Sequence, residues 1–172
     1  ASPEQQAFFA SLGRVSRVAE MRTMARVGDQ RQLAALKAVD AAYPLYGGFG
    51  LAPPLAREDG LDLRRGAYGA AVDQAFLDAT GIAIGDRFEL NRTLFEVRAV
   101  VTEEADRGVG LLTLGPRVLI DHAGLAATGL TAPGALVTWR HRIALPDGAD
   151  PSAAADAITR QFGDPGWRLQ TS

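Results

Sequence analysis

An alternation of small or apolar residues with mostly charged ones over positions 15–27 constrains the fold of this 172-residue chain more than any other feature. Every second position carries a residue that suits a buried face: Ala19, Met21, Thr23, Ala25 and Val27. This period of two is typical of a β-strand with one buried side. Gly28-Asp29-Gln30 then favours a turn, and residues 32–39 predict a returning strand. Residues 15–39 are therefore expected to form a hairpin.

Other signals along the chain predict a mixture of helices and strands. Capping residues and closing glycines indicate helices at residues 2–13, 73–80, 121–129 and 150–162. Alternating patterns predict strands at residues 87–90, 94–101, 118–120, 135–145 and 167–170. Two further stretches carry neither pattern and are expected to be irregular, residues 40–66 and 103–115.

Together these elements predict an α+β fold with helices on one face of an antiparallel sheet. Residues 1–50 and 116–172 are assigned to this helix-on-sheet layer, and residues 51–115 to a small β-rich unit inserted into it. The Gly-, Pro- and aromatic-rich segment at residues 40–66 is expected to be the joint between the two.

Composition narrows the possible chemistry. The absence of cysteine excludes a disulfide scaffold, a thiolate zinc site and a cysteine nucleophile. A formal net charge of −2 argues against a dedicated nucleic-acid binder, and no apolar run of 18 residues is present to span a bilayer. His122 and His141 have no carboxylate at helical ligand spacing. We therefore expect neither a metal nor another cofactor.

Glu103, Glu104 and Asp106 form an acidic cluster, and paired carboxylates can carry acid–base catalysis. Such catalysis needs carboxylates whose pKa values a pocket pushes apart. Because the three fall in a predicted exposed loop, we interpret them as a solvated charge cluster, with a hydrolase that uses them as the alternative. No serine lies in a Gly-x-Ser-x-Gly motif, which argues against a serine hydrolase.

The aromatic side chains of the predicted joint have two interpretations, and the sequence leaves both open. Tyr43, Tyr46 and Phe49 either form an exposed apolar patch for a partner or fold back to fill the joint.

Several stretches of the chain match one family pattern. The most specific pair is Leu36-Lys37-Ala38-Val39-Asp40 with Tyr43-Pro44-Leu45-Tyr46-Gly47. The others run from Val72 to Leu77, from Thr80 to Phe88, and over Asp106-Arg107-Gly108 with Leu114 to Leu119. Across residues 14–162 the chain thus resembles the extracytoplasmic domain of FtsX-like ABC transporter permeases, the MacB-like periplasmic core, and among them the YbbP type.

This resemblance implies a porter-like α+β subdomain with a small inserted β subdomain and no catalytic residues. It implies a domain tethered by flanking membrane helices at the periplasmic face of the bacterial inner membrane, and this chain would be a piece excised between them. A separate cytoplasmic ATPase subunit would hydrolyse ATP, and the membrane helices would pass the motion on. The motion would export or extract a hydrophobic or lipid-type cargo, or act on a periplasmic partner protein.

Such a role favours an apolar cleft at the joint as the surface for cargo or partner. We predict that it is lined by Leu45, Tyr46, Phe49 and Leu51. A stand-alone protein-binding module is the remaining alternative, and apolar segments of about 20 residues on both sides of the domain would argue against it.

Overall fold

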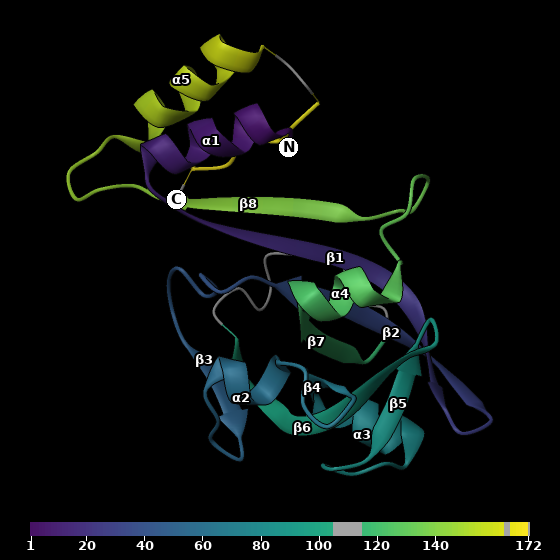
Figure 1. Cartoon of the computed structure of the whole chain (residues 1–172). Helices are drawn as coiled ribbons and strands as arrows, with labels where there is room; N and C mark the ends of the chain where they lie inside the picture. Colours follow the sequence, from purple (N-terminus) through teal and green to yellow (C-terminus); the bar gives the residue numbers. More distant parts are fainter. Residues whose placement is uncertain (105–114, 164–165, 172) are drawn as a thin grey trace. The chain divides into compact units, whose positions relative to one another are not determined.

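The computed structural model describes residues 1–104, 115–163 and 166–171. Figure 1 labels its elements. In chain order they are α1 (Pro3–Leu12), β1 (Arg14–Val27), β2 (Gln30–Val39), β3 (Phe49–Ala52), α2 (Arg57–Leu61), β4 (Tyr68–Val72), α3 (Gln74–Thr80), β5 (Arg87–Leu90), β6 (Thr93–Glu104), β7 (Arg117–Asp121), α4 (His122–Thr128), β8 (Thr138–Ala144) and α5 (Pro151–Phe162). The chain groups into two compact units: unit 1 holds residues 1–15 and 142–172, and unit 2 holds residues 16–141.

Six strands of unit 2 pair in a closed ring. Their hydrogen-bonded order is β2–β7–β4–β6–β5–β1, and β1 pairs back with β2. The β1–β2 hairpin is antiparallel and in register from Val18 opposite Val39 to Val27 opposite Gln30. Gly28, with a φ of 57°, supplies the positive φ that its two-residue turn requires. The predicted hairpin is thus confirmed, while β3 and β8 pair with β6 and β1 outside the ring.

The α+β class is also confirmed, but the predicted antiparallel sheet is wrong, because the sheet is mixed. β2 runs parallel to β7, and β4 runs parallel to β6. β4 was not predicted at all: its sequence YGAAV shows no alternation, and four of its five residues are buried. A central strand covered on both faces gives no period-two signal.

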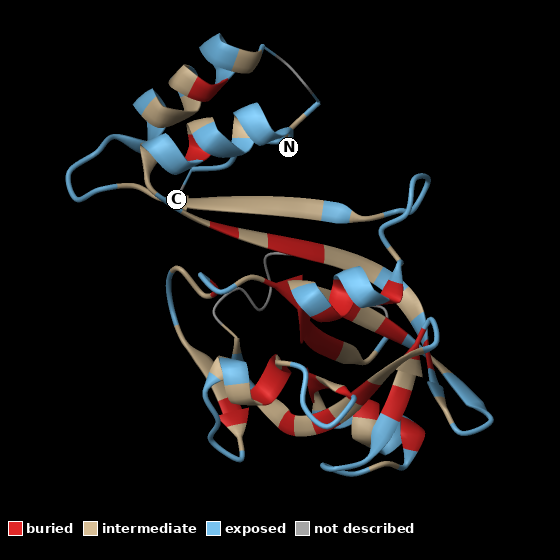
Figure 2. Cartoon of the chain, in the orientation of Figure 1, coloured by how far each residue is buried: buried red, intermediate tan, exposed pale blue. Residues whose placement is uncertain are grey.

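Two hydrophobic cores cover opposite faces of the ring strands. The first core centres on Phe76, Phe88 and Phe95. The centroid of the Phe88 ring lies 5.2 Å from that of Phe76 and 5.8 Å from that of Phe95. The second core includes Val18, Val39, Tyr43, Leu51, Leu61, Ala71, Ala99 and Leu119. Figure 2 shows the buried residues concentrated on the ring strands, α3 and α4. Because strands buried on both faces carry apolar residues on both, the middle strands show little alternation of apolar and polar residues.

The segment over residues 40–66 is more regular than predicted, because it contains β3 and α2. α2 packs closely on β4: a Cβ on Gly69 would lie 2.1 Å from the carbonyl oxygen of Gly60. Only glycine permits that approach. The predicted joint therefore contains packed structure that covers the second core.

Unit 1 is built from α1, α5 and the chain ends. Ser2 caps α1 in a capping box with Gln5, as predicted from its Ser-Pro start. Phe162 of α5 meets Phe8 of α1 edge-on, with ring centroids 5.3 Å apart. The predicted strand at residues 167–170 is wrong: the segment forms no strand, and Trp167 instead packs against Phe9 with ring centroids 5.4 Å apart.

Candidate functional site

The four residues predicted to line a cargo surface lie at different depths. Tyr46 is 61% exposed, whereas Leu51 is buried in the second core. Leu45 and Phe49 are half-buried, and the Phe49 ring packs edge-on against Tyr43 with centroids 5.8 Å apart. The structure therefore exposes Tyr46 and folds Tyr43 and Phe49 back onto the core, and a role of these residues in cargo binding stays a prediction.

Glu104 corrects the prediction of a solvated acidic cluster. Its side chain is 5% exposed. Lys37 Nζ donates to Oε1 and Arg117 Nη1 donates to Oε2, each at 2.5 Å. Glu103 is exposed, as predicted, and Asp106 lies outside the described residues. β6 continues past its predicted end, where Glu103 and Glu104 pair with Gly50 and Phe49 of β3.

The stretch at residues 36–47, which carried the family resemblance, supplies the polar contacts around Glu104. Lys37 Nζ also donates to the Tyr43 hydroxyl at 3.0 Å and lies 4.6 Å from the centre of that ring. The Asp40 carboxylate accepts from Ser16 Oγ at 2.9 Å and from the Arg17 amide at 2.5 Å. These bonds fix the chain after β2 to the ring, so the motif residues hold structure together.

A cavity of about 20 Å³ adjoins this cluster, lined by Lys37, Asp73, Val101, Glu104, Arg117, Val118 and Leu119. That volume holds about one water molecule. Both oxygens of the Glu104 carboxylate are thus engaged by cations, beside a space for about one water molecule.

The two histidines are half-buried, which disfavours their charged form. Burial lowers the pKa of His122 below its ordinary value and lowers that of His141 to about 4. The His122 ring meets Trp139 edge-on at 5.9 Å, and the Arg17 guanidinium lies 3.7 Å from the centre of the Trp139 ring. In the part of the chain that the structure describes, no group of three or more His, Asp or Glu side chains is placed to hold a metal ion.

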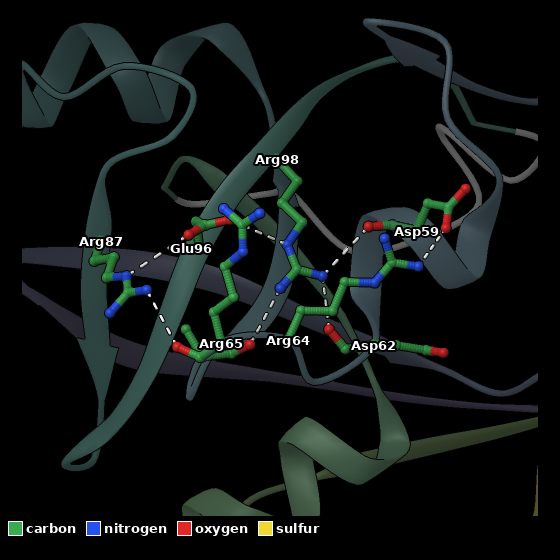
Figure 3. A network of polar contacts seen from close by, with 8 residues as sticks. Asp59, Asp62, Arg64, Arg65, Arg87, Glu96 and Arg98 are labelled. Carbon is green, nitrogen blue, oxygen red and sulfur yellow. Dashed lines mark hydrogen bonds and ion pairs between the residues drawn. The ribbon is translucent and has the colours of Figure 1, made fainter.

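A second polar network, shown in Figure 3, centres on Arg98 of β6. Its side chain is 8% exposed. The guanidinium donates to the main-chain carbonyls of Asp59, Asp62 and Ala67 at 3.3, 2.6 and 3.1 Å. Arg98 also pairs with Glu96 at 3.3 Å. No pattern in the sequence predicts this network, because its members come from separate elements and share no spacing.

Solved structures share the fold of this chain. The periplasmic region of MacB from Actinobacillus actinomycetemcomitans is 16% identical with a TM-score of 0.57, over 88% of this chain and 66% of that one. The extracellular domain of the noncanonic ABC-type transporter YknZ from Gram-positive bacteria is 12% identical with a TM-score of 0.61, over 95% of this chain and 84% of that one. The fold is therefore that of extracytoplasmic domains of ABC transporters.

The sequence itself matches the MacB-like periplasmic core domain over residues 2–161, and the chain belongs to that family. It is 30% identical over 120 residues to the uncharacterized ABC transporter permease YbbP of Escherichia coli (strain K12), a match that covers 70% of this chain and 14% of that protein. The resemblance noted from the sequence is thus confirmed.

The chain is accordingly a periplasmic or extracellular domain of a MacB/FtsX-like ABC transporter permease, of a kind that is typically non-catalytic. Within the described residues, every helix is too short or too polar to cross a membrane.

Proposed function

We propose that this domain passes ATP-driven motion to the outer side of the membrane and catalyses no reaction itself. In this proposal a separate cytoplasmic ATPase subunit hydrolyses ATP, and membrane helices of the permease connect it to the domain. The motion moves a hydrophobic or lipid-type cargo or acts on a periplasmic partner. Membership of the MacB-like periplasmic core family, with 30% identity to a permease, is the observation that carries the proposal.

The architecture supports a mechanical role. β1 runs without a break over 14 residues, a length of roughly 45 Å for an extended strand. It pairs with β2 at ten successive positions, and a strand bonded along its length resists stretching. Both ends of the chain belong to unit 1, which suits a domain tethered to one membrane face.

We also propose the family's subdivision, a porter-like subdomain with an inserted β-rich one at residues 51–115. β6 pairs with β4 at five positions and with β5 at four, and all of these pairs lie within residues 68–100. The same segment joins the outer strands through only two pairs between β4 and β7 and two between β5 and β1. This difference supports an inserted unit whose strands complete a shared sheet.

Within residues 1–104, 115–163 and 166–171, no observation favours the alternative of a hydrolase, and Asp106 lies outside them. Both oxygens of Glu104 are engaged in ion pairs, and Glu103 is an exposed residue at the end of the same strand.

The test uses the full-length permease, reconstituted with its ATPase subunit in vesicles. The probe is a fluorescent phospholipid, and ATP-dependent transfer of the probe out of the vesicles is measured. We expect Tyr46→Ser to reduce transfer severalfold with unchanged basal ATP hydrolysis, because Tyr46 is the exposed aromatic of the predicted surface. Leu136→Ser is the matched control, since Leu136 is 93% exposed and lies outside that surface. Equal transfer by both variants would remove Tyr46 from the cargo path, and an absence of any ATP-dependent transfer would contradict lipid cargo.

A further inference from the structure

An open hollow of about 380 Å³ lies on unit 2, lined by Leu55, Asp59, Arg64, Arg65, Glu96 and Arg98. Its size lies within the range of small-ligand sites.

Two arginines of the hollow stand on a tight turn. The main chains of Arg64 and Ala67 exchange hydrogen bonds of 2.9 and 3.1 Å, and the two central residues, Arg65 and Gly66, have φ values of 51° and 78°. Positive φ at both central positions defines a turn that favours Asn-Gly. Arginine is disfavoured at the first position because its Cβ crowds the following carbonyl.

Two other arginines donate hydrogen bonds to main-chain carbonyls of this turn and of the residues before it. Arg98 binds the carbonyl oxygens of Asp59, Asp62 and Ala67, on either side of the turn. Arg87 donates to the carbonyl oxygen of Arg65 at 3.3 Å. The main chain that carries Arg64 and Arg65 is therefore set in place before any ligand arrives, which lowers the entropic cost of binding.

The hollow has more positive than negative charge. Its lining holds three arginines, Arg64, Arg65 and Arg98, and two carboxylates, those of Asp59 and Glu96, while the carboxylate of Asp62 points away (Figure 3). Arg64 pairs with Asp59, and Arg87 and Arg98 share Glu96. Arg65 is exposed, and the structure gives its guanidinium no ion pair with any described residue.

We propose that this hollow binds the phosphate head group of an anionic amphiphile. A guanidinium offers paired donors that match phosphate oxygens, and Arg65 is the one with donors to spare. Leu55, 37% exposed, gives the hollow an apolar wall for the start of a tail. The inference names a cargo class for the proposed function and rests on it for the lipid tail.

The test measures binding to the 172-residue chain itself by amide NMR. The probe is a short-chain phosphatidylglycerol in monomeric form, with inorganic phosphate, an uncharged alkyl maltoside and polyglutamate as comparisons. The key variant is Arg65→Asn, since asparagine tolerates positive φ and keeps the turn. Arg92→Asn is its matched control, because Arg92 is also an exposed arginine with a positive φ, 71°, but lies in another turn.

We expect saturable shifts of the amides of residues 64–67 with phosphatidylglycerol, weaker shifts with inorganic phosphate, and none with the maltoside. Arg65→Asn should weaken binding by about tenfold, the loss of a charge-assisted pair, and Arg92→Asn should leave it unchanged. Absent shifts, equal binding of inorganic phosphate, tighter binding of polyglutamate at these amides, or equal losses in the two variants would each overturn the proposal. Because this experiment measures binding without ATP, its outcome is independent of the transfer assay that tests the proposed transport role.

Discussion

Glu104 ends β6 with a carboxylate that accepts from Lys37 and Arg117, in a side chain that is 5% exposed. Burying such a group costs desolvation free energy, which the partners recover only while all of them are present. The cluster therefore joins β2, β6 and β7 in a way that tolerates no single deletion. Its contribution lies in fixing these strands relative to one another.

Replacing Glu104 by glutamine should show this dependence. Glu104→Gln leaves two cations close to a neutral amide, and we expect the free energy of unfolding to fall by about 3 kcal/mol, as for other broken buried pairs. Urea denaturation of the chain measures it. The control is Glu89→Gln, which removes a partner from the 55% exposed Arg26 and should cost less than about 1 kcal/mol. Equal losses in the two variants would contradict the buried cluster.

His122 gives the stability a pH dependence of known sign. Burial keeps its folded-state pKa below the ordinary value of 6.5, so below that pH the unfolded chain takes up a proton that the folded chain does not. The contribution of neutral His122 to the free energy of unfolding is present in full above about pH 6.5 and declines as the pH falls. We expect the urea midpoint to drop in this window and His122→Gln to reduce the drop. Part of the drop should remain in that variant, because the pKa of His141 is also lowered, to about 4. A midpoint that rises on acidification through this window would contradict the assignment.

At the scale of elements, the turn between β5 and β6 holds an unfavourable residue. Asn91 and Arg92 have φ values of 45° and 71°. Asparagine adopts such values more readily than arginine does. Arg92→Gly should raise the free energy of unfolding by about 0.5–1 kcal/mol. Arg31→Gly, in the extended backbone of β2, should lower it by a similar amount. Thermal and urea unfolding of both variants measure the effect, and a loss of stability in Arg92→Gly would show that its side chain is needed there.

Elements with a one-sided pattern were predictable from the sequence, and elements packed on both sides were not. The hairpin of β1 and β2 and the capped helices α3 and α4 follow their local signals. β4 carries small and apolar residues on both faces, and β3 has only four residues. The predicted strand at residues 167–170 alternates in sequence, but Trp167 packs with Phe9 and Phe162 instead. Pairing partners distant in sequence decide these cases.

The candidate sites followed the same division. The position of Tyr46 on the surface agrees with one of two interpretations left open by the sequence, and the packing of Tyr43 with Phe49 agrees with the other. The ion pairs of Glu104 and the arginines around Arg98 depend on residues far apart in the chain. Spacing within a sequence carries no information about such contacts, so only the fold reveals them.

At the scale of the whole molecule, the proposed function is that of a moving part whose energy comes from another subunit. Family membership places the chain outside the cytoplasm as a domain of a permease. The proposed transmission of movement needs a rigid unit, and the paired strands and buried ion pairs of unit 2 suit that proposal. The central claim is that this domain changes position as ATP is bound and hydrolysed elsewhere.

The most direct measurement is a distance in the full-length permease assembled with its ATPase subunit. The chain contains no cysteine, so Asp29→Cys in the exposed β1–β2 turn places one spin label in the domain, and a second label marks a cytoplasmic position of the permease. Pulsed electron spin resonance then gives the distance between them in nucleotide-free and ATP-bound states. The account predicts two different distances, which interconvert as ATP is turned over. An identical distance in every state, in a preparation that still transfers cargo, would contradict it.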